Sequence, residues 1–219
     1  MNNIHRFIEH TNLKPTIVAK DVDQIVSEAK DFSFLGICVP PFWVKKASRE
    51  IGDADIQLVT VIGFPLGYQM AETKVAEIEM AIKTGVDELD VVMNISSFKT
   101  GLPWTKIEIA KFSKMAHDYG KLIKVIIETA YLTEGEILKA AKLCADAGVD
   151  FVKTSTGFAG KGAQPEHIKL LRENLPSNVG IKASGGIKTF NEAKSMIEAG
   201  ADRIGTSSGI EIVQENENS

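Results

Sequence analysis

The chain has 219 residues, an apolar content of 44% and a formal net charge of −4, which indicate one globular domain with room for a full core. The acidic balance argues against nucleic acid or a membrane surface as a partner, and no apolar run reaches transmembrane length. Cys38 and Cys144 are far apart and the histidines form no close ligand pair, so we expect no metal site. Two distant cysteines also indicate no disulfide framework, and a cytoplasmic protein is expected.

Short apolar strands alternate with amphipathic helices along the whole chain. Strands are predicted at residues 7–13, 35–39, 57–64, 88–94, 122–127, within 149–158, 179–184 and 203–206. Helical patterns follow each strand, the first with Asp21 as its expected cap. The pattern predicts an α/β fold, a closed parallel (β/α)8 TIM barrel, over residues 1–213, with a frayed polar tail at 214–219. A doubly wound sheet is the alternative, but no Gly-x-Gly-x-x-Gly follows the first strand.

A short repeat marks the entry to three of these strands. Residues 84–87, 147–150 and 199–202 each end a helix with glycine and lead through aspartate into strands four, six and eight. Glycine supplies the left-handed conformation that commonly ends a helix. The repeat supports the barrel because its members are about two strand–helix units apart.

A lysine inside an apolar strand is the first sign of chemistry. Lys153 follows Val-Asp-Phe-Val and precedes a hydroxyl-rich turn that ends at Gly157. Burial lowers the pKa of an ammonium group, which suits an amine nucleophile, although a structural ion pair explains the same pattern. Asp90 and Lys153 each stand three residues after a repeat aspartate, so we expect both at one level near the C-terminal mouth of the barrel.

A second inward lysine, Lys182 on strand seven, favours catalysis over a simple ion pair. Two ammonium groups beside Asp90 lower each other's pKa, so one of them can be neutral near pH 7 and attack a carbonyl to form a Schiff base. The aspartate and the other lysine would then move protons. On the residues alone, either Lys153 or Lys182 could be the nucleophile.

The turns after strands seven and eight predict a phosphate-binding site, because this fold commonly binds phosphate there. The residues expected to bind the substrate or its phosphate are Thr156, Gly157, Gly185, Gly186, Gly205, Ser207 and Ser208. Thr11 and Cys38, near the ends of strands one and two, could line the site. For Cys38, packing as a small buried thiol is the alternative.

At these residues the sequence closely resembles the deoxyribose-phosphate aldolases, a family of class I aldolases. Highly specific segments are Asp-Val-Val-Met-Asn at 90–94, Val-Lys-Thr-Ser-Thr-Gly at 152–157 and Lys-Ala-Ser-Gly-Gly at 182–186. The resemblance implies reversible cleavage of 2-deoxy-D-ribose 5-phosphate to D-glyceraldehyde 3-phosphate and acetaldehyde. It makes Lys153 the Schiff-base lysine and Asp90 with Lys182 the proton-transfer pair. It also implies a cytoplasmic enzyme without a cofactor, and often a homodimer.

The sequence departs from the family pattern in three places. Position 9 is Glu where Asp is more usual, and residues 158–164 are a less regular glycine-rich run than expected. Some members also reach a C-terminal tyrosine into the site, whereas this chain has no tyrosine beyond Tyr131. Proton transfer is therefore expected to depend on Asp90, Lys182 and water.

Three other functions fit parts of the pattern. Another lysine-dependent barrel aldolase, such as one of the transaldolase type, would take a longer phosphosugar partner. A phosphosugar isomerase would use Asp90 without a covalent step, and would keep substantial activity when Lys153 is replaced by arginine. An inactive sugar-binding barrel fits badly, because two buried lysines and an aspartate cost stability.

Overall fold

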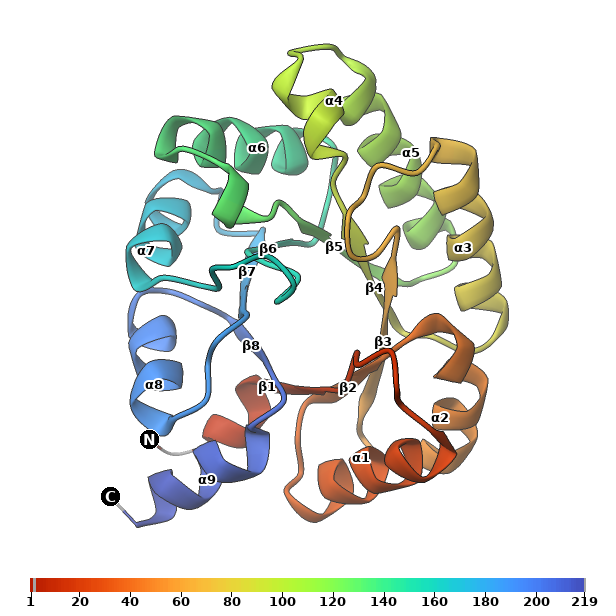
Figure 1. The fold of residues 1–219 in the computed structure, drawn as a ribbon, viewed down its shortest axis with the longest axis vertical. Coiled ribbons are helices and arrows are strands. Elements are labelled where there is room, and N and C mark those ends of the chain that lie inside the picture. The colour runs from red at the N-terminus through yellow and green to blue at the C-terminus, as the bar shows by residue number, and fades with distance from the viewer. Residues whose placement is uncertain (2, 219) are drawn as a thin grey trace.

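In residues 1 and 3–218, which the computed structural model describes, eight parallel strands close into one barrel (Figure 1). Each strand pairs with its neighbours in chain order, and β1 also pairs with β8. The TIM-barrel prediction is confirmed. The strands are β1 (Ile8–Thr11), β2 (Gly36–Val39), β3 (Gln57–Ile62), β4 (Glu88–Val92), β5 (Leu122–Ile126), β6 (Phe151–Lys153), β7 (Gly180–Ser184) and β8 (Arg203–Thr206).

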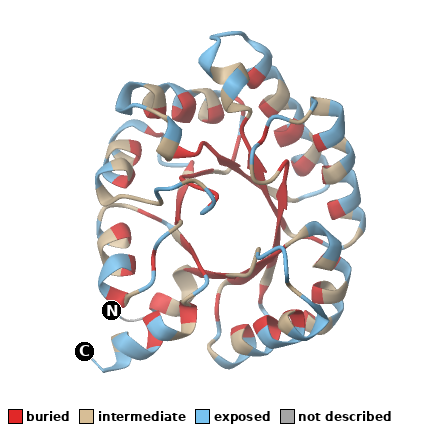
Figure 2. Ribbon diagram, in the orientation of Figure 1, coloured by how far each residue is buried: buried red, intermediate tan, exposed pale blue. Residues whose placement is uncertain are grey.

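The helices form an outer layer around the strands, and the buried residues concentrate on the strands and on the inner faces of the helices (Figure 2). None of the described helices is long and apolar enough to cross a membrane. The α-helices are α1 (Ala19–Asp31), α2 (Val44–Ile51), α3 (Ala71–Lys83), α4 (Ile95–Lys99), α5 (Trp104–Asp118), α6 (Glu134–Asp146), α7 (Pro165–Asn174), α8 (Phe190–Glu198) and α9 (Gly209–Glu217). Short 3-10 helices cover Ile4–Phe7, Pro41–Trp43 and Thr129–Tyr131.

The aspartates of the sequence repeat join the strands in pairs at the N-terminal end of the barrel. Asp87 accepts a hydrogen bond from the Leu58 N–H of β3 at 2.9 Å. Asp150 accepts a hydrogen bond from the Ile123 N–H of β5 at 2.8 Å. Asp202 accepts one from the Ile181 N–H of β7 at 2.7 Å. The glycine two residues before each aspartate has a positive φ. The repeat therefore fixes the registers β3–β4, β5–β6 and β7–β8, which place the inward side chains.

Two predictions about element ends are wrong. Asp21 is not the cap of α1 but lies inside it, where its carboxylate accepts from the Val18 N–H at 2.8 Å. The expected tail does not start after residue 213, because α9 continues to Glu217. The last turn of α9 contacts the N-terminus, because the Met1 ammonium group donates a hydrogen bond to Asn216 Oδ1 at 2.7 Å. Ser219 lies outside the described residues.

Candidate active site

Lys153 ends β6 and is brought beside Lys182 by strand pairing. The two lysines are register partners on β6 and β7, and Lys153 also pairs with Ile126 of β5. Lys182 is fully buried, whereas Lys153 is 3% exposed and lines a cavity at the C-terminal mouth. The mouth therefore gives access to Lys153.

Asp90 lies at the centre of a buried cluster of lysines. Its Oδ2 accepts hydrogen bonds from Lys153 Nζ and Lys182 Nζ, each at 2.7 Å. Its Oδ1 accepts from Lys124 Nζ of β5 at 3.0 Å. The three residues singled out from the sequence thus lie together, with Lys124 as a third lysine that the sequence analysis did not identify.

Further ion pairs surround this cluster. Glu9 of β1 contacts Lys182, and it lies 3.4 Å from Lys124. Arg203 of β8 lies 3.0 Å from Glu9 and 2.5 Å from Glu88, which also contacts Lys124 at 2.5 Å. Within the described residues the cluster has three carboxylates and four basic groups. One positive charge is therefore in excess unless one lysine is neutral.

The pKa directions separate the lysines. Burial and the neighbouring Lys182 ammonium outweigh the attraction of Asp90 and lower the pKa of Lys153 below its usual 10.5. Burial also acts on Lys182 and Lys124, but the carboxylates of Asp90 and Glu9 outweigh it and raise both pKa values. Lys153 is therefore the lysine of this cluster that loses its proton most readily.

The two central carboxylates stay ionised. Burial alone would raise the pKa of Asp90, but Lys124, Lys153 and Lys182 hold it well below 3.8. For Glu9, Lys124 and Lys182 likewise outweigh burial and lower the pKa to about 2. Asp90 can therefore accept a hydrogen bond from an ammonium group throughout the neutral pH range.

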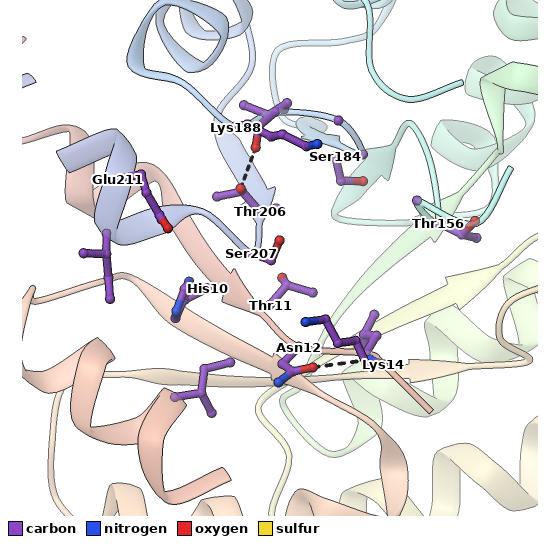
Figure 3. Close-up of a pocket in the computed structure, with 18 of the residues that line it drawn as sticks. His10, Thr11, Asn12, Lys14, Thr156, Ser184, Lys188, Thr206, Ser207 and Glu211 are labelled. Atoms are coloured by element: carbon purple, nitrogen blue, oxygen red, sulfur yellow. Dashed lines mark hydrogen bonds between the residues drawn. The ribbon is translucent and has the colours of Figure 1, made fainter. Parts of the chain in front are cut away.

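The cavity above Lys153 has a volume of about 540 Å³ and opens between the ends of β1, β6, β7 and β8. Figure 3 shows Thr11, Ser184, Lys188, Thr206 and Ser207 around it. The lining includes most of the residues expected to contact substrate, namely Thr11, Thr156, Gly157, Gly185, Gly186, Gly205 and Ser207. Lys14 and Lys188 add two cations that the sequence analysis missed. Lys188 therefore adds a positive charge after β7, and Lys14 adds one after β1.

Two expected lining residues do not line the cavity. Ser208 precedes α9 and donates its N–H to Thr206 Oγ1 at 2.9 Å. Cys38 is fully buried inside the barrel, and burial raises the pKa of its thiol to about 11. Ser208 therefore has a structural role in the turn, and Cys38 is a neutral packing residue below the cavity.

Gly205 has a second role besides lining the cavity. A Cβ atom at this position would lie 2.9 Å from Lys182 Cε, inside normal contact distance. The missing side chain on β8 therefore leaves the space that the Lys182 side chain occupies.

Glu128 supports the turn after β6. It follows β5 with a left-handed backbone, φ 50°, and is 2% exposed. Its Oε2 accepts from the Thr156 N–H at 3.1 Å and from the Thr156 hydroxyl. The hydroxyl oxygen in turn accepts from the Phe158 N–H at 3.1 Å. A buried carboxylate thus fixes one wall of the cavity.

Among the described residues, no group of three or more His, Cys, Asp and Glu side chains could hold a metal ion.

A family model described as DeoC/LacD family aldolase matches residues 5–215. The chain belongs to the DeoC/LacD aldolase family. The resemblance inferred from the motifs is thereby confirmed, and the protein is an enzyme of the aldolase class.

Curated relatives and solved structures agree with this family assignment. A deoxyribose-phosphate aldolase from Thermococcus gammatolerans is 47% identical over 215 residues, covering 97% of this chain and 96% of the relative. The solved structure of the aldolase QR15 is 40% identical with a TM-score of 0.94, over 100% of this chain and 97% of that one. A tetrameric deoxyribose phosphate aldolase from Aeropyrum pernix is 33% identical with a TM-score of 0.88, and the match covers 96% of this chain and 89% of that one.

Proposed function

We propose that this aldolase reversibly cleaves 2-deoxy-D-ribose 5-phosphate to D-glyceraldehyde 3-phosphate and acetaldehyde through a Schiff base on Lys153. The observation that carries the proposal is that Lys153 combines access to the cavity with a lowered pKa. The other two lysines of the cluster are fully buried and have raised pKa values. The names of the curated relatives support the substrate.

In the proposed reaction the neutral Lys153 amine attacks the C1 aldehyde carbon of the substrate. The resulting carbinolamine loses water to form an iminium ion, which accepts electrons from the breaking C2–C3 bond. The C3 hydroxyl gives up its proton as D-glyceraldehyde 3-phosphate leaves. The remaining enamine is protonated at C2, and water then releases acetaldehyde from the lysine.

Asp90 and Lys182 are the proposed proton-transfer pair. Lys182 remains an ammonium group because its pKa is raised, so it can donate a proton to the carbinolamine hydroxyl. Asp90 contacts both lysine nitrogens at 2.7 Å and can pass the proton between them. Water accepts the proton from the C3 hydroxyl and delivers one to C2, because the described part of the chain places no tyrosine in the cavity lining.

The phosphate is proposed to bind at the β7–β8 side of the cavity. Gly185 and Gly186 both have positive φ, which turns backbone toward the cavity without side chains in the way. Ser207 adds a hydroxyl, and Lys188 adds a positive charge. This arrangement puts the phosphate at one end of the cavity and C1 at Lys153.

The test is borohydride reduction in the presence of acetaldehyde, followed by peptide mass spectrometry. We expect a two-carbon adduct on the Lys153 peptide. The matched control is Lys74, a fully buried lysine of α3 with a lowered pKa that lies outside the barrel and should stay unlabelled. An adduct on Lys182 would reverse the roles of the two lysines, and no adduct on folded protein would refute the Schiff-base mechanism.

Homodimeric assembly and a cytoplasmic location are proposed from the family resemblance alone. The Aeropyrum pernix relative is tetrameric, so assembly varies among proteins of this kind. Light scattering of the purified protein should give a mass near twice 23.8 kDa. A monomer or tetramer would contradict the dimer, and cell fractionation tests the location.

A further inference from the structure

The inside of the barrel is divided into a charged part and an apolar part. The ion-pair cluster occupies β1 and β4–β8. Cys38 of β2 with Val59 and Val61 of β3 forms a separate buried apolar cluster, against which Leu13 and Phe64 pack. Leu13, which packs on this cluster, lines the same cavity as Lys153.

An aromatic pair crosses the mouth above this apolar cluster. Phe64 follows β3 and Phe158 follows β6, two strands that are not neighbours in the barrel. Their ring centroids are 5.2 Å apart and the rings are edge-to-face at 87°. Phe158 lines the cavity and is 55% exposed, and Figure 1 shows the segment after β6 reaching inward over the barrel opening.

The segment that carries Phe158 is held at both ends. At its start, the Phe158 N–H donates to Thr156, which Glu128 holds in turn. At its end, the Ala163 N–H donates to the carbonyl groups of Ser184 and Gly185, each at 3.1 Å. Hydrogen bonds therefore hold the backbone on both sides of Phe158, and its ring packs against Phe64.

We propose that Phe64 and Phe158, with Leu13, limit the size of the donor aldehyde. This inference rests on the proposed function, which joins C1 of the donor to Lys153 and directs the phosphate toward β7 and β8. Leu13 and Phe158 line the cavity together with Lys153, and Phe64 packs behind the Phe158 ring, so an additional carbon on C1 or C2 of the donor would meet this apolar wall. Acetaldehyde is then the donor that fits best, and propanal and propanone react more slowly.

The test is aldol addition of acetaldehyde, propanal or propanone to D-glyceraldehyde 3-phosphate by Phe158→Ala, Phe158→Leu and Phe64→Ala variants. We expect kcat/KM for propanal relative to acetaldehyde to rise at least about tenfold in Phe158→Ala, as removal of a pocket wall allows. The matched control is Phe42→Ala. Phe42 is 83% exposed and forms a similar edge-to-face pair with Trp43 outside the cavity, so its removal should leave the ratio unchanged.

Three results would overturn the inference. They are an unchanged donor ratio in both alanine variants, an equal loss of rate for all donors, and the same ratio change in Phe42→Ala. A wild-type protein that adds no acetaldehyde and forms no Lys153 adduct would instead refute the proposed function. Thermal unfolding of each variant identifies any that fail to fold, and Phe158→Leu then provides the milder change.

Discussion

Lys153 and Lys182 are register partners on adjacent strands, and both donate a hydrogen bond to the same oxygen of Asp90 at 2.7 Å. The two ammonium groups therefore compete for one carboxylate. Lys182 also has Glu9, whereas Lys153 has no second ion-pair partner among the described residues. This difference explains why the pKa of Lys182 is raised and that of Lys153 is lowered.

Two substitutions should move the pH dependence of Lys153 in opposite directions. Asp90→Asn removes the carboxylate that raises the pKa of Lys153, so half-maximal borohydride trapping should occur at lower pH than in wild type. Lys182→Met removes an ammonium group that lowers this pKa, so trapping should move to higher pH. Turnover should fall about 100-fold or more in both variants. A shift in the same direction for both would contradict the charge assignment.

Acid should destabilise the fold through the buried carboxylates. The folded pKa of Glu9 is about 2 against 4.5 unperturbed, so its stabilisation is complete above about pH 4.5 and is lost as the pH falls toward 2. Glu9→Gln should lower the free energy of unfolding at pH 7 by about 3–5 kcal/mol, because it leaves the four basic groups of the cluster with only two carboxylates. The free energy of unfolding of Glu9→Gln should also fall less steeply than that of wild type as the pH drops below about 4.5.

Urea unfolding between pH 2 and 7 measures both effects of Glu9→Gln. The control is Asp55→Asn, which removes the exposed partner of Arg6 at 3.0 Å and should change stability by at most about 1 kcal/mol. Equal effects of the two substitutions would show that burial adds nothing to the Glu9 ion pairs.

Replacing Glu128 should impair both stability and catalysis. Glu128→Ala removes both hydrogen bonds to Thr156 and should cost about 1.5–3 kcal/mol of stability, while Glu128→Gln keeps one acceptor and should cost less. The control is Glu136→Ala, which removes the same kind of contact to Thr133 on the surface. Only the Glu128 variants should lower kcat/KM, and an equal loss in Glu136→Ala would contradict this expectation.

Gly162 is predicted to be sterically intolerant of a side chain. A Cβ atom there would lie 2.0 Å from the Gly185 carbonyl oxygen, so Gly162→Ala must push the segment away from β7. We expect kcat/KM to fall about tenfold to 100-fold. Gly160→Ala is the control, because its Cβ would meet no atom within 4 Å. Similar kinetics for the two variants would show that the segment does not need its place on β7.

Lys188 should contribute to phosphate binding. Lys188→Ala should lower kcat/KM for the phosphorylated sugar about tenfold to 100-fold, the value of one charge-assisted hydrogen bond. The rate with unphosphorylated 2-deoxyribose should not change. Lys194→Ala on the outer face of α8 provides the control, because Lys194 pairs with Glu198 and lies outside the cavity. An equal loss of kcat/KM with both sugars would show that Lys188 does not act through the phosphate group.

The strand alternation predicted the barrel and the meeting of Asp90, Lys153 and Lys182, because parallel strands carry an inward residue at every second position. Lys124 gives the same signal. It stands in the middle of Leu-Ile-Lys-Val-Ile, as Lys153 stands in its own strand, but it was not among the candidate residues. A count of all inward charges would have found it.

Glu128 and Phe158 could not be predicted in this way. Both lie in turns after their strands, where no periodicity tells which way a side chain points. The left-handed backbone of Glu128 is uncommon for this residue type and has no sequence signature. Ser208 was expected to contact phosphate because it follows β8, but it is the residue before α9 and is not part of the cavity lining.

The division of the barrel interior has a consequence for how such an enzyme can change. Every charged side chain of the cluster except Lys153 pairs with residues on at least two other strands, so an exchange there disturbs several partners at once. Val59 and Val61 take part in no ion pair among the described residues, and volume-conserving exchanges of such residues usually cost less than about 1.5 kcal/mol. The apolar part of the barrel interior can therefore vary in sequence while the ion-pair cluster is retained.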